Sequence, residues 1–229
     1  MVMNVTLIIP ALNEAECIGP LLAELPPGMV QQVIVVDNGS TDDTAGAARC
    51  SGAQVVTEAR RGYGYACAAG VAAASGDVLA FMDADGSFIA TELVRLLAPI
   101  RAGTADLALG TRMLGGMVAG AMPPHQLWGN RLVARLMHAL YGLQLTDLGP
   151  FRAIRRETLA ALHMRDRTYG WPVEMIVKAA RRGARITEVP VSYRPRMAGR
   201  SKVGGTLRGT TLATYRILST TFRYAFDRV

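Results

Sequence analysis

The 229-residue sequence has few of the residues that mark redox or zinc chemistry, with three cysteines and three histidines. Cys17, Cys50 and Cys67 are odd in number and lack metal-ligand spacing, so we interpret them as buried, reduced thiols of a cytoplasmic protein. No apolar run reaches the roughly 18 residues that a membrane-spanning helix needs. Residues 1–9 lack the basic start of a signal peptide, and we expect them to form a core strand.

Acidic residues are scarce in the second half of the chain. Residues 1–111 carry 12 Asp and Glu against 5 Lys and Arg, whereas residues 112–229 carry 6 against 20. The basic half suits nucleic acid, anionic lipid or a phosphorylated acceptor, or its arginines serve only solubility. Aromatic residues make up 6% of the chain, too few for stacking platforms, so we expect no nucleic-acid partner.

Short β-branched runs alternate with helical patterns, which is typical of a single α/β domain with a mostly parallel sheet. We expect strands at 5–9, 33–37, 54–57, 78–82 and 106–109, and helices near 14–25, 42–51, 62–75 and 91–102. Parallel sheets bind ligands beyond the carboxyl ends of their strands, so functional residues should collect at one edge.

Beyond residue 112 the pattern is less regular. The uncharged, Gly- and Met-rich segment 113–129 predicts a long loop, followed by a helix near 130–142, a strand near 151–155, a helix near 172–182 and a strand near 186–193. Segment 205–226 has apolar residues at helical spacing with arginines between them: Leu207, Leu212, Tyr215, Leu218, Phe222 and Ala225, with Arg208, Arg216 and Arg223. Such a helix either lies in a lipid interface or packs on its own domain.

Acidic residues follow two of the expected strands. Asp83 and Asp85 come directly after the apolar run 78–82 and form a hard-oxygen site suited to Mg²⁺ or Mn²⁺, which can bridge the phosphates of a nucleotide-linked donor. Alone, an Asp-x-Asp pair is also common in solvated turns. Asp37 ends the second strand, where an acid can bind a ribose or a nucleobase. The Asn-Gly pair that follows it equally fits a simple strand–turn–helix.

Other nucleotide-binding classes fit the sequence less well. A dinucleotide-binding protein needs Gly-x-Gly-x-x-Gly after the first strand, where residues 10–13 read Pro-Ala-Leu-Asn. The Gly-Lys-Ser/Thr of a P-loop is absent, and so is the Gly-rich loop with Arg and Lys of a nucleotidylyltransferase. A non-catalytic binding protein would not explain acids at three strand ends.

Taken in order, five motifs resemble those of the inverting GT-A glycosyltransferases of family 2, and most of all the branch of dolichyl- and polyprenyl-phosphate sugar synthases. They are 9–14, 36–43, 60–64, 82–85 and 110–112. The resemblance covers roughly 4–204 and implies a GT-A domain at 1–204. Residues 1–111 would form its donor-nucleotide half and 112–204 its acceptor half, with an amphipathic helix at 205–229.

The resemblance also implies the chemistry. It implies a UDP- or GDP-sugar donor, a divalent cation and an acceptor that is either a polyprenyl phosphate or a soluble hydroxyl. The residues that match the donor-nucleotide site are Pro10, Leu12, Glu14, Asp37, Asp83 and Arg112. Asp85, with Asp83, would hold the metal. The oligomeric state is left open by the sequence.

Three downstream segments resemble the same branch: 147–152, 171–174 and 189–202. They imply an acceptor or phosphate site of Arg152, Arg194, Arg196, Arg200, Ser201 and Lys202, suited to a lipid phosphate. A hydroxyl acceptor would need a general base, for which Glu174 and Asp147 are the candidates. The chain departs from the family at 86–90, which reads Gly-Ser-Phe-Ile-Ala. We expect a cytoplasmic enzyme, peripheral at the inner face of the membrane.

Overall fold

A computed structural model describes residues 3–199 and 207–226. Strands and helices alternate through the first 111 residues: β1 (Val5–Ala11), α1 (Ala15–Ala23), β2 (Gln32–Asp37), α2 (Thr44–Cys50), β3 (Gln54–Thr57), α3 (Tyr63–Ala73), β4 (Val78–Phe81), the short 3-10 helix η1 (Ala90–Glu92), α4 (Leu93–Arg101) and β5 (Leu107–Thr111). Every strand and helix expected in this half is present, with boundaries within two residues of the prediction.

The second half is more helical than the sequence predicts. Its elements are α5 (Pro124–Tyr141), β6 (Arg152–Arg155), α6 (Arg156–Leu162), α7 (Trp171–Arg181), β7 (Ile186–Pro190) and α8 (Leu207–Phe226). The expected loop at 113–129 is too long, because Pro124 occupies the first turn of α5. Proline suits that position, since it has no N–H to leave unpaired and its φ is already helical. Helix α6 was not predicted.

The seven strands form one mostly parallel sheet in the order β3-β2-β1-β4-β6-β5-β7. Strand β6 is antiparallel and lies between β4 and β5, where Arg152 is paired with both Phe81 and Leu109. Because β6 runs the opposite way, its first residue lies beside the carboxyl ends of its neighbours. The segment that precedes β6, including Asp147, therefore reaches the same edge as Asp83 and Arg112.

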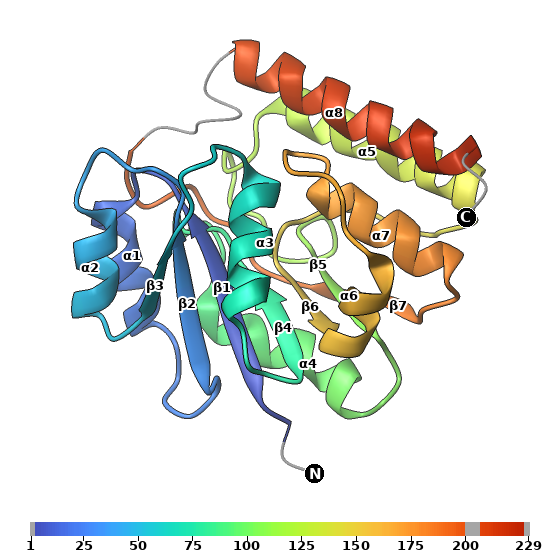
Figure 1. The fold of residues 1–229 in the computed structure, drawn as a ribbon. Coiled ribbons are helices and arrows are strands. Elements are labelled where there is room, and N and C mark those ends of the chain that lie inside the picture. The colour runs from blue at the N-terminus through green and yellow to red at the C-terminus, as the bar shows by residue number, and fades with distance from the viewer. Residues whose placement is uncertain (1–2, 200–206, 227–229) are drawn as a thin grey trace.

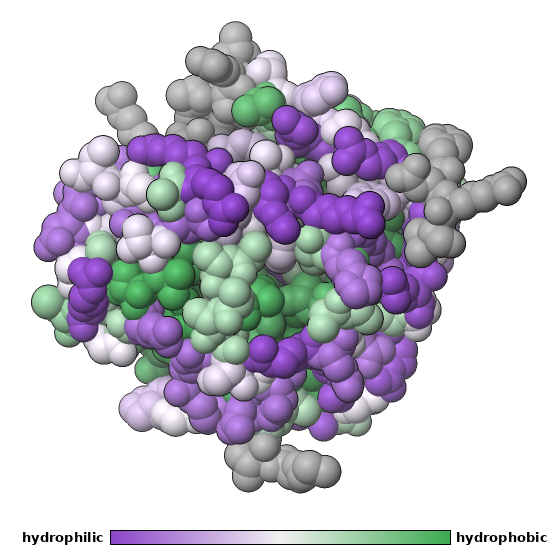
Figure 2. Space-filling model, in the orientation of Figure 1, coloured by the Kyte–Doolittle hydropathy of each residue, from purple (hydrophilic) through white to green (hydrophobic). Residues whose placement is uncertain are grey.

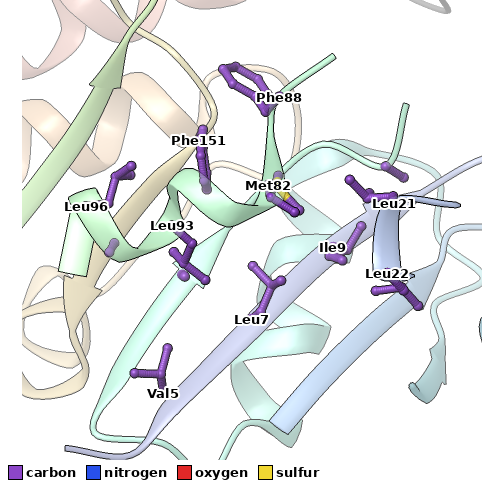
Figure 3. Close-up of a cluster of buried hydrophobic side chains, with 14 of the residues drawn as sticks. Val5, Leu7, Ile9, Leu21, Leu22, Met82, Phe88, Leu93, Leu96 and Phe151 are labelled. Atoms are coloured by element: carbon purple, nitrogen blue, oxygen red, sulfur yellow. The ribbon is translucent and has the colours of Figure 1, made fainter. Parts of the chain in front are cut away.

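Helices cover both faces of the sheet (Figure 1). Helices α1, α2 and α4 pack on one face, around a core that includes Leu7, Ile9 and Met82 (Figure 3). Helices α3, α6 and α7 pack on the other face, and α5 and α8 pack on α7. No helix within 3–199 or 207–226 is long and apolar enough to cross a membrane. Cys17 and Cys67 are buried as expected, but Cys50 is exposed.

Two helical glycines offer a matched test of this packing. A Cβ on Gly70 of α3 would lie 2.4 Å from Cγ2 of Ile8, whereas nothing lies within 4 Å of a Cβ on Gly129 of α5. We expect Gly70→Ala to lower the free energy of unfolding by about 1–3 kcal/mol through overpacking. Gly129→Ala should raise it by about 0.5–1 kcal/mol, because alanine restricts the unfolded chain. Urea denaturation measures both, and equal effects would contradict the packing of α3 on β1.

Candidate functional site

Acidic residues predicted from the sequence follow the ends of three adjacent strands. β1 lies between β2 and β4 in the sheet, so the segments that carry Glu14, Asp37 and Asp83–Asp85 emerge side by side. Hydrogen bonds join the first two: the Asn13 backbone N–H donates to Oγ of Ser40 (3.0 Å), and Oδ1 of Asn13 accepts from the Thr41 N–H (2.7 Å). The sheet edge therefore gathers these carboxyl groups, as the strand pattern predicts.

The Asp85 carboxylate is fixed by its own turn. Its Oδ1 accepts from the backbone N–H of Ser87 at 3.0 Å and from the Ser87 hydroxyl at 2.5 Å. Gly86 has a φ of +70°, which a residue with a side chain rarely adopts. The other carboxylate oxygen, Oδ2, lies 3.7 Å from Nη1 of Arg196. The turn thus holds one carboxylate oxygen and leaves the second facing the Arg196 guanidinium.

Asp83 lies beside it in a different environment. No hydrogen-bond donor within 3–199 or 207–226 contacts its carboxylate. Burial, together with the charge of Asp85, raises the pKa of Asp83 to about 7, although Arg112 and Arg152 act in the opposite direction. A partly buried carboxyl group without donors is stabilised by any cation that approaches it. The pair therefore has the electrostatics of a cation site.

Residues 194–197, which follow β7, lie across this turn. The Arg194 N–H donates to the Ser87 carbonyl and the Met197 N–H to the Asp85 carbonyl, both at 2.9 Å. The Arg196 guanidinium donates from Nη2 to both oxygens of Glu14, at 2.7 and 2.8 Å. Arg196 therefore bridges the acids that follow β1 and β4, and its role in phosphate binding stays a prediction.

Arg194 links the Asp85 turn to the end of α1. Its Nε donates to the Gly86 carbonyl at 2.7 Å, and its Nη2 pairs with Glu24 of the α1 C-terminus at 2.5 Å. Glu24 could not be found from the sequence, since an acid at the end of a helix gives no signal of a partner 170 residues away. The predicted residues Arg200, Ser201 and Lys202 lie outside the residues that the structure describes.

Arg112 and Asp147 form a buried ion pair. The guanidinium donates from Nε to Oδ2 and from Nη2 to Oδ1, each at 2.7 Å, and the Arg112 backbone N–H donates to Oδ2 at 2.8 Å. Burial lowers the pKa of Arg112, but Asp147 outweighs this effect and the net pKa is raised. Glu188 of β7 accepts from the backbone of Thr146 and Asp147, which fixes the pair. With both oxygens engaged, Asp147 holds Arg112 and does not have the free carboxylate that a general base needs.

Arg152 lies in the core, which contradicts its predicted role in phosphate binding. It is 1% exposed, and its guanidinium donates to the carbonyls of Pro172 (2.8 Å) and Gly149 (2.6 Å). Burial lowers the pKa of Arg152. Its guanidinium N–H groups donate to backbone carbonyls near the start of β6 and at the start of α7, so the residue stabilises the loops that carry the site.

Glu174 is also structural, which contradicts its predicted role as a general base. Its carboxylate is fully buried and accepts from the Tyr224 hydroxyl (2.6 Å) and the Asp166 backbone N–H (2.7 Å), and it pairs with Lys178 (2.6 Å). Burial acts to raise the pKa of Glu174, but Lys178, Tyr224 and the backbone donors prevail and the pKa is lowered. These contacts tie α7 to α8 and to the segment before α7.

On the nucleotide side, Asp37 and its neighbour Asn38 have separate tasks. Oδ1 of Asp37 accepts from the Ser40 N–H at 2.9 Å, within its own turn. Asn38 is 6% exposed, donates to the carbonyls of Glu58 and Arg60, and accepts from the Gly62 N–H. The sequence indicates a turn at Asn38 and gives no signal that this side chain also shapes the 58–62 loop. Pro10 and Leu12 are half-buried on the β1 side of the same edge.

An aromatic cluster lies next to the Asp85 turn. Phe88 lies 5.1 Å from the Tyr193 ring and 5.3 Å from the Phe151 ring, measured between centroids. The Arg112 guanidinium stands 5.1 Å over the Tyr193 ring. Phe88 belongs to the segment 86–90 that departs from the family motif, and it is buried. The segment therefore places packed aromatic rings next to Asp85.

Glu174→Gln separates a structural role from a catalytic one. We expect it to lower the free energy of unfolding by about 3 kcal/mol, because it removes the buried negative charge that pairs with Lys178. Turnover per folded molecule should stay near wild type. Since folding lowers the pKa of Glu174, its contribution is present above the unfolded pKa and is lost as pH falls through the folded value.

Denaturant melts at neutral and acid pH measure this, with Glu157→Gln on the exposed part of α6 as the matched control. A large loss of turnover with unchanged stability would show that Glu174 acts as a base after all.

Comparisons with known proteins agree with this geometry. The model of the family described as Glycosyl transferase family 2 matches residues 6–162 of this chain. An uncharacterised glycosyltransferase of Mycobacterium tuberculosis is 44% identical over 213 residues, which cover 91% of this chain and 94% of the relative. An undecaprenyl-phosphate mannosyltransferase of Micrococcus luteus is 35% identical over 224 residues, with 90% of each chain covered.

Among solved structures, the glucosyl-3-phosphoglycerate synthase of Mycobacterium tuberculosis, in complex with Mn²⁺, UDP and glucosyl-3-phosphoglycerate, superposes with a TM-score of 0.80. It is 26% identical and covers all of this chain, which spans 82% of that structure. The predicted GT-A fold is confirmed, and the relatives and structural neighbours are glycosyltransferases. The chain belongs to glycosyl transferase family 2 and is a glycosyltransferase.

Proposed function

We propose that this glycosyltransferase moves a hexose from a UDP- or GDP-sugar to a polyprenyl phosphate, with Mg²⁺ or Mn²⁺ bound at Asp83 and Asp85. The observation that carries the proposal is that Asp83 and Asp85 lie together at one sheet edge, where Arg196 faces Asp85 and Glu14. The structural neighbour from Mycobacterium tuberculosis was crystallised with Mn²⁺ and UDP, which supports the donor class and the cation.

The acidic pair fits a divalent cation. Mg²⁺ is usually held by one or two carboxylates and completes its shell with water and substrate phosphates. Asp85 offers Oδ2, and Asp83 has no hydrogen-bond donor among the described residues. No group of three or more His, Cys, Asp or Glu that could hold a metal ion gathers within those residues. A bound cation there would neutralise charge on the departing diphosphate.

The chain's own residues supply the rest of the leaving-group stabilisation. Arg196 faces Glu14 and Asp85 and is placed to donate to a diphosphate, and a guanidinium binds phosphate with two parallel hydrogen bonds. Glu14, which Arg196 now contacts, lies where the resemblance puts the ribose. The reaction is an in-line displacement at the anomeric carbon, with inversion.

The acceptor is either a lipid phosphate or a soluble hydroxyl, and the surroundings of the candidate bases favour the phosphate. Glu174 and Asp147 are held in internal contacts, so neither is free to take a proton from a hydroxyl. A phosphate acceptor is anionic at neutral pH and needs no strong base. The undecaprenyl-phosphate mannosyltransferase relative supports this choice. The glucosyl-3-phosphoglycerate synthase neighbour supports the second candidate, a soluble hydroxyl acceptor. A polyprenyl acceptor also requires contact with a membrane surface, for which the amphipathic segment 205–226 is a candidate.

Asp85→Asn tests the cation site. We expect it to abolish transfer, because the amide has no charge to hold the cation, while the melting temperature stays near that of wild type. Asp77→Asn, at a turn before β4 on the opposite edge, is the matched control and should keep full activity. Activity that survives in Asp85→Asn, or in wild type with EDTA, would contradict the proposal.

A donor and acceptor panel tests the substrates. We expect UDP or GDP with Mn²⁺ to raise the melting temperature, since a ligand of the folded state stabilises it. Asp37→Ala should remove much of that rise. With the stabilising donor, a short-chain polyprenyl phosphate should accept the sugar and 3-phosphoglycerate should not. Transfer to 3-phosphoglycerate alone would establish the soluble acceptor instead.

A further inference from the structure

Helix α5 presents an apolar and basic face to solvent. Trp128 is 70% exposed and Leu132 51% exposed, and they lie four residues apart on one side of the helix, beside Arg131 and Arg135. The opposite side, with Met137, packs into the domain. Two large apolar side chains so exposed on the same turns of a well-packed helix indicate a surface that meets something other than water.

Helix α8 repeats the arrangement. Its inward side is fixed, because the Tyr141 hydroxyl donates to the Thr221 carbonyl and the Tyr224 hydroxyl donates to Glu174. Three large residues point away from these contacts and are 42–64% exposed, and an arginine directly follows two of them: Leu212, Tyr215 and Phe222, with Arg216 and Arg223. The helix therefore packs on its domain, the second alternative from the sequence, and keeps an apolar stripe on its outer side.

The two helices lie side by side at one end of the molecule (Figure 1). Figure 2 shows green, apolar surface in this region at the upper right. The sequence has no Asp or Glu in 107–146 or in 189–226, which include both helices. Their combined outer surface, the α5–α8 face, therefore carries aromatic, aliphatic and cationic groups without a single acid on either helix.

We propose that the α5–α8 face docks on an anionic lipid bilayer; this rests on the proposed lipid-phosphate acceptor. Trp and Tyr are favoured at the boundary between headgroups and acyl chains, where one end of the side chain is apolar and the other polar. The arginines complement anionic headgroups. A second copy of the same face would instead bring arginines against arginines, which disfavours a symmetric dimer through it.

The face is also connected to the active site. Asn130 of α5 donates to the Thr146 carbonyl (3.0 Å) and accepts from the Leu148 N–H (3.2 Å), on both sides of Asp147. Trp128 is thus two residues from the contact that holds the Asp147–Arg112 pair. Docking through α5 sets the site beside the headgroup layer, where a lipid phosphate is presented.

The experiment is co-sedimentation of the full chain with phosphatidylcholine vesicles, with and without phosphatidylglycerol. Wild type should sediment with the anionic vesicles. The double variant Trp128→Ser and Leu132→Ser should reduce the bound fraction about tenfold, and Arg131→Gln with Arg135→Gln should remove the preference for phosphatidylglycerol. Val94→Ser, at a residue 47% exposed on α4, makes a similar change on the other side of the sheet and should bind as wild type does.

Two results would overturn the proposal: wild type that stays in the supernatant with both vesicles, or a dimer that the α5 variants dissociate in sedimentation equilibrium. Transfer to a short-chain, detergent-soluble polyprenyl phosphate separates this test from that of the proposed function. Docking-defective variants should retain that activity. If wild type transfers to the soluble substrate but does not bind vesicles, only the docking proposal fails.

Discussion

Carboxyl groups brought together at the end of a parallel sheet repel one another, and this structure depends on how that repulsion is compensated. At Asp83 the repulsion is visible in the pKa, which burial and the charge of Asp85 raise to about 7. Glu14 and Asp85 receive their compensation from Arg196. The acids come from the first half of the chain and the guanidinium from the second, so the opposite net charges of the two halves meet at one edge.

The antiparallel strand β6 makes this meeting possible. By lying between β4 and β5 it returns Asp147 to the carboxyl edge, where Asp147 holds Arg112, and it buries Arg152 beneath the same loops. β7 then places the 194–197 segment over the Asp85 turn. A cation and a diphosphate would enter a region where negative and positive groups already alternate. Such an arrangement needs little rearrangement to stabilise a leaving group.

Much of this could be predicted from the sequence, because β-branched runs and the acids at their ends are local signals. The positions of β1 to β5 and the common edge of Glu14, Asp37 and Asp83 follow from them. The antiparallel insertion of β6 could not be predicted, since strand order depends on pairing and not on composition. The motif resemblance also assigned Arg152 and Glu174 to the site, although both lie in the core. A motif gives residue types, whereas burial decides whether a charged group faces substrate or the protein interior.

The direct test of the account is calorimetric titration of UDP and of GDP into the protein, with and without Mn²⁺. If the acids and Arg196 form one site for a metal-bound diphosphate, one nucleotide should bind at least about tenfold more tightly with Mn²⁺, a difference of about 1.4 kcal/mol. That gain should disappear in Asp85→Asn. Equal affinity with and without Mn²⁺ in wild type would show that the carboxyl groups do not hold a cation against the diphosphate, and would contradict the central claim.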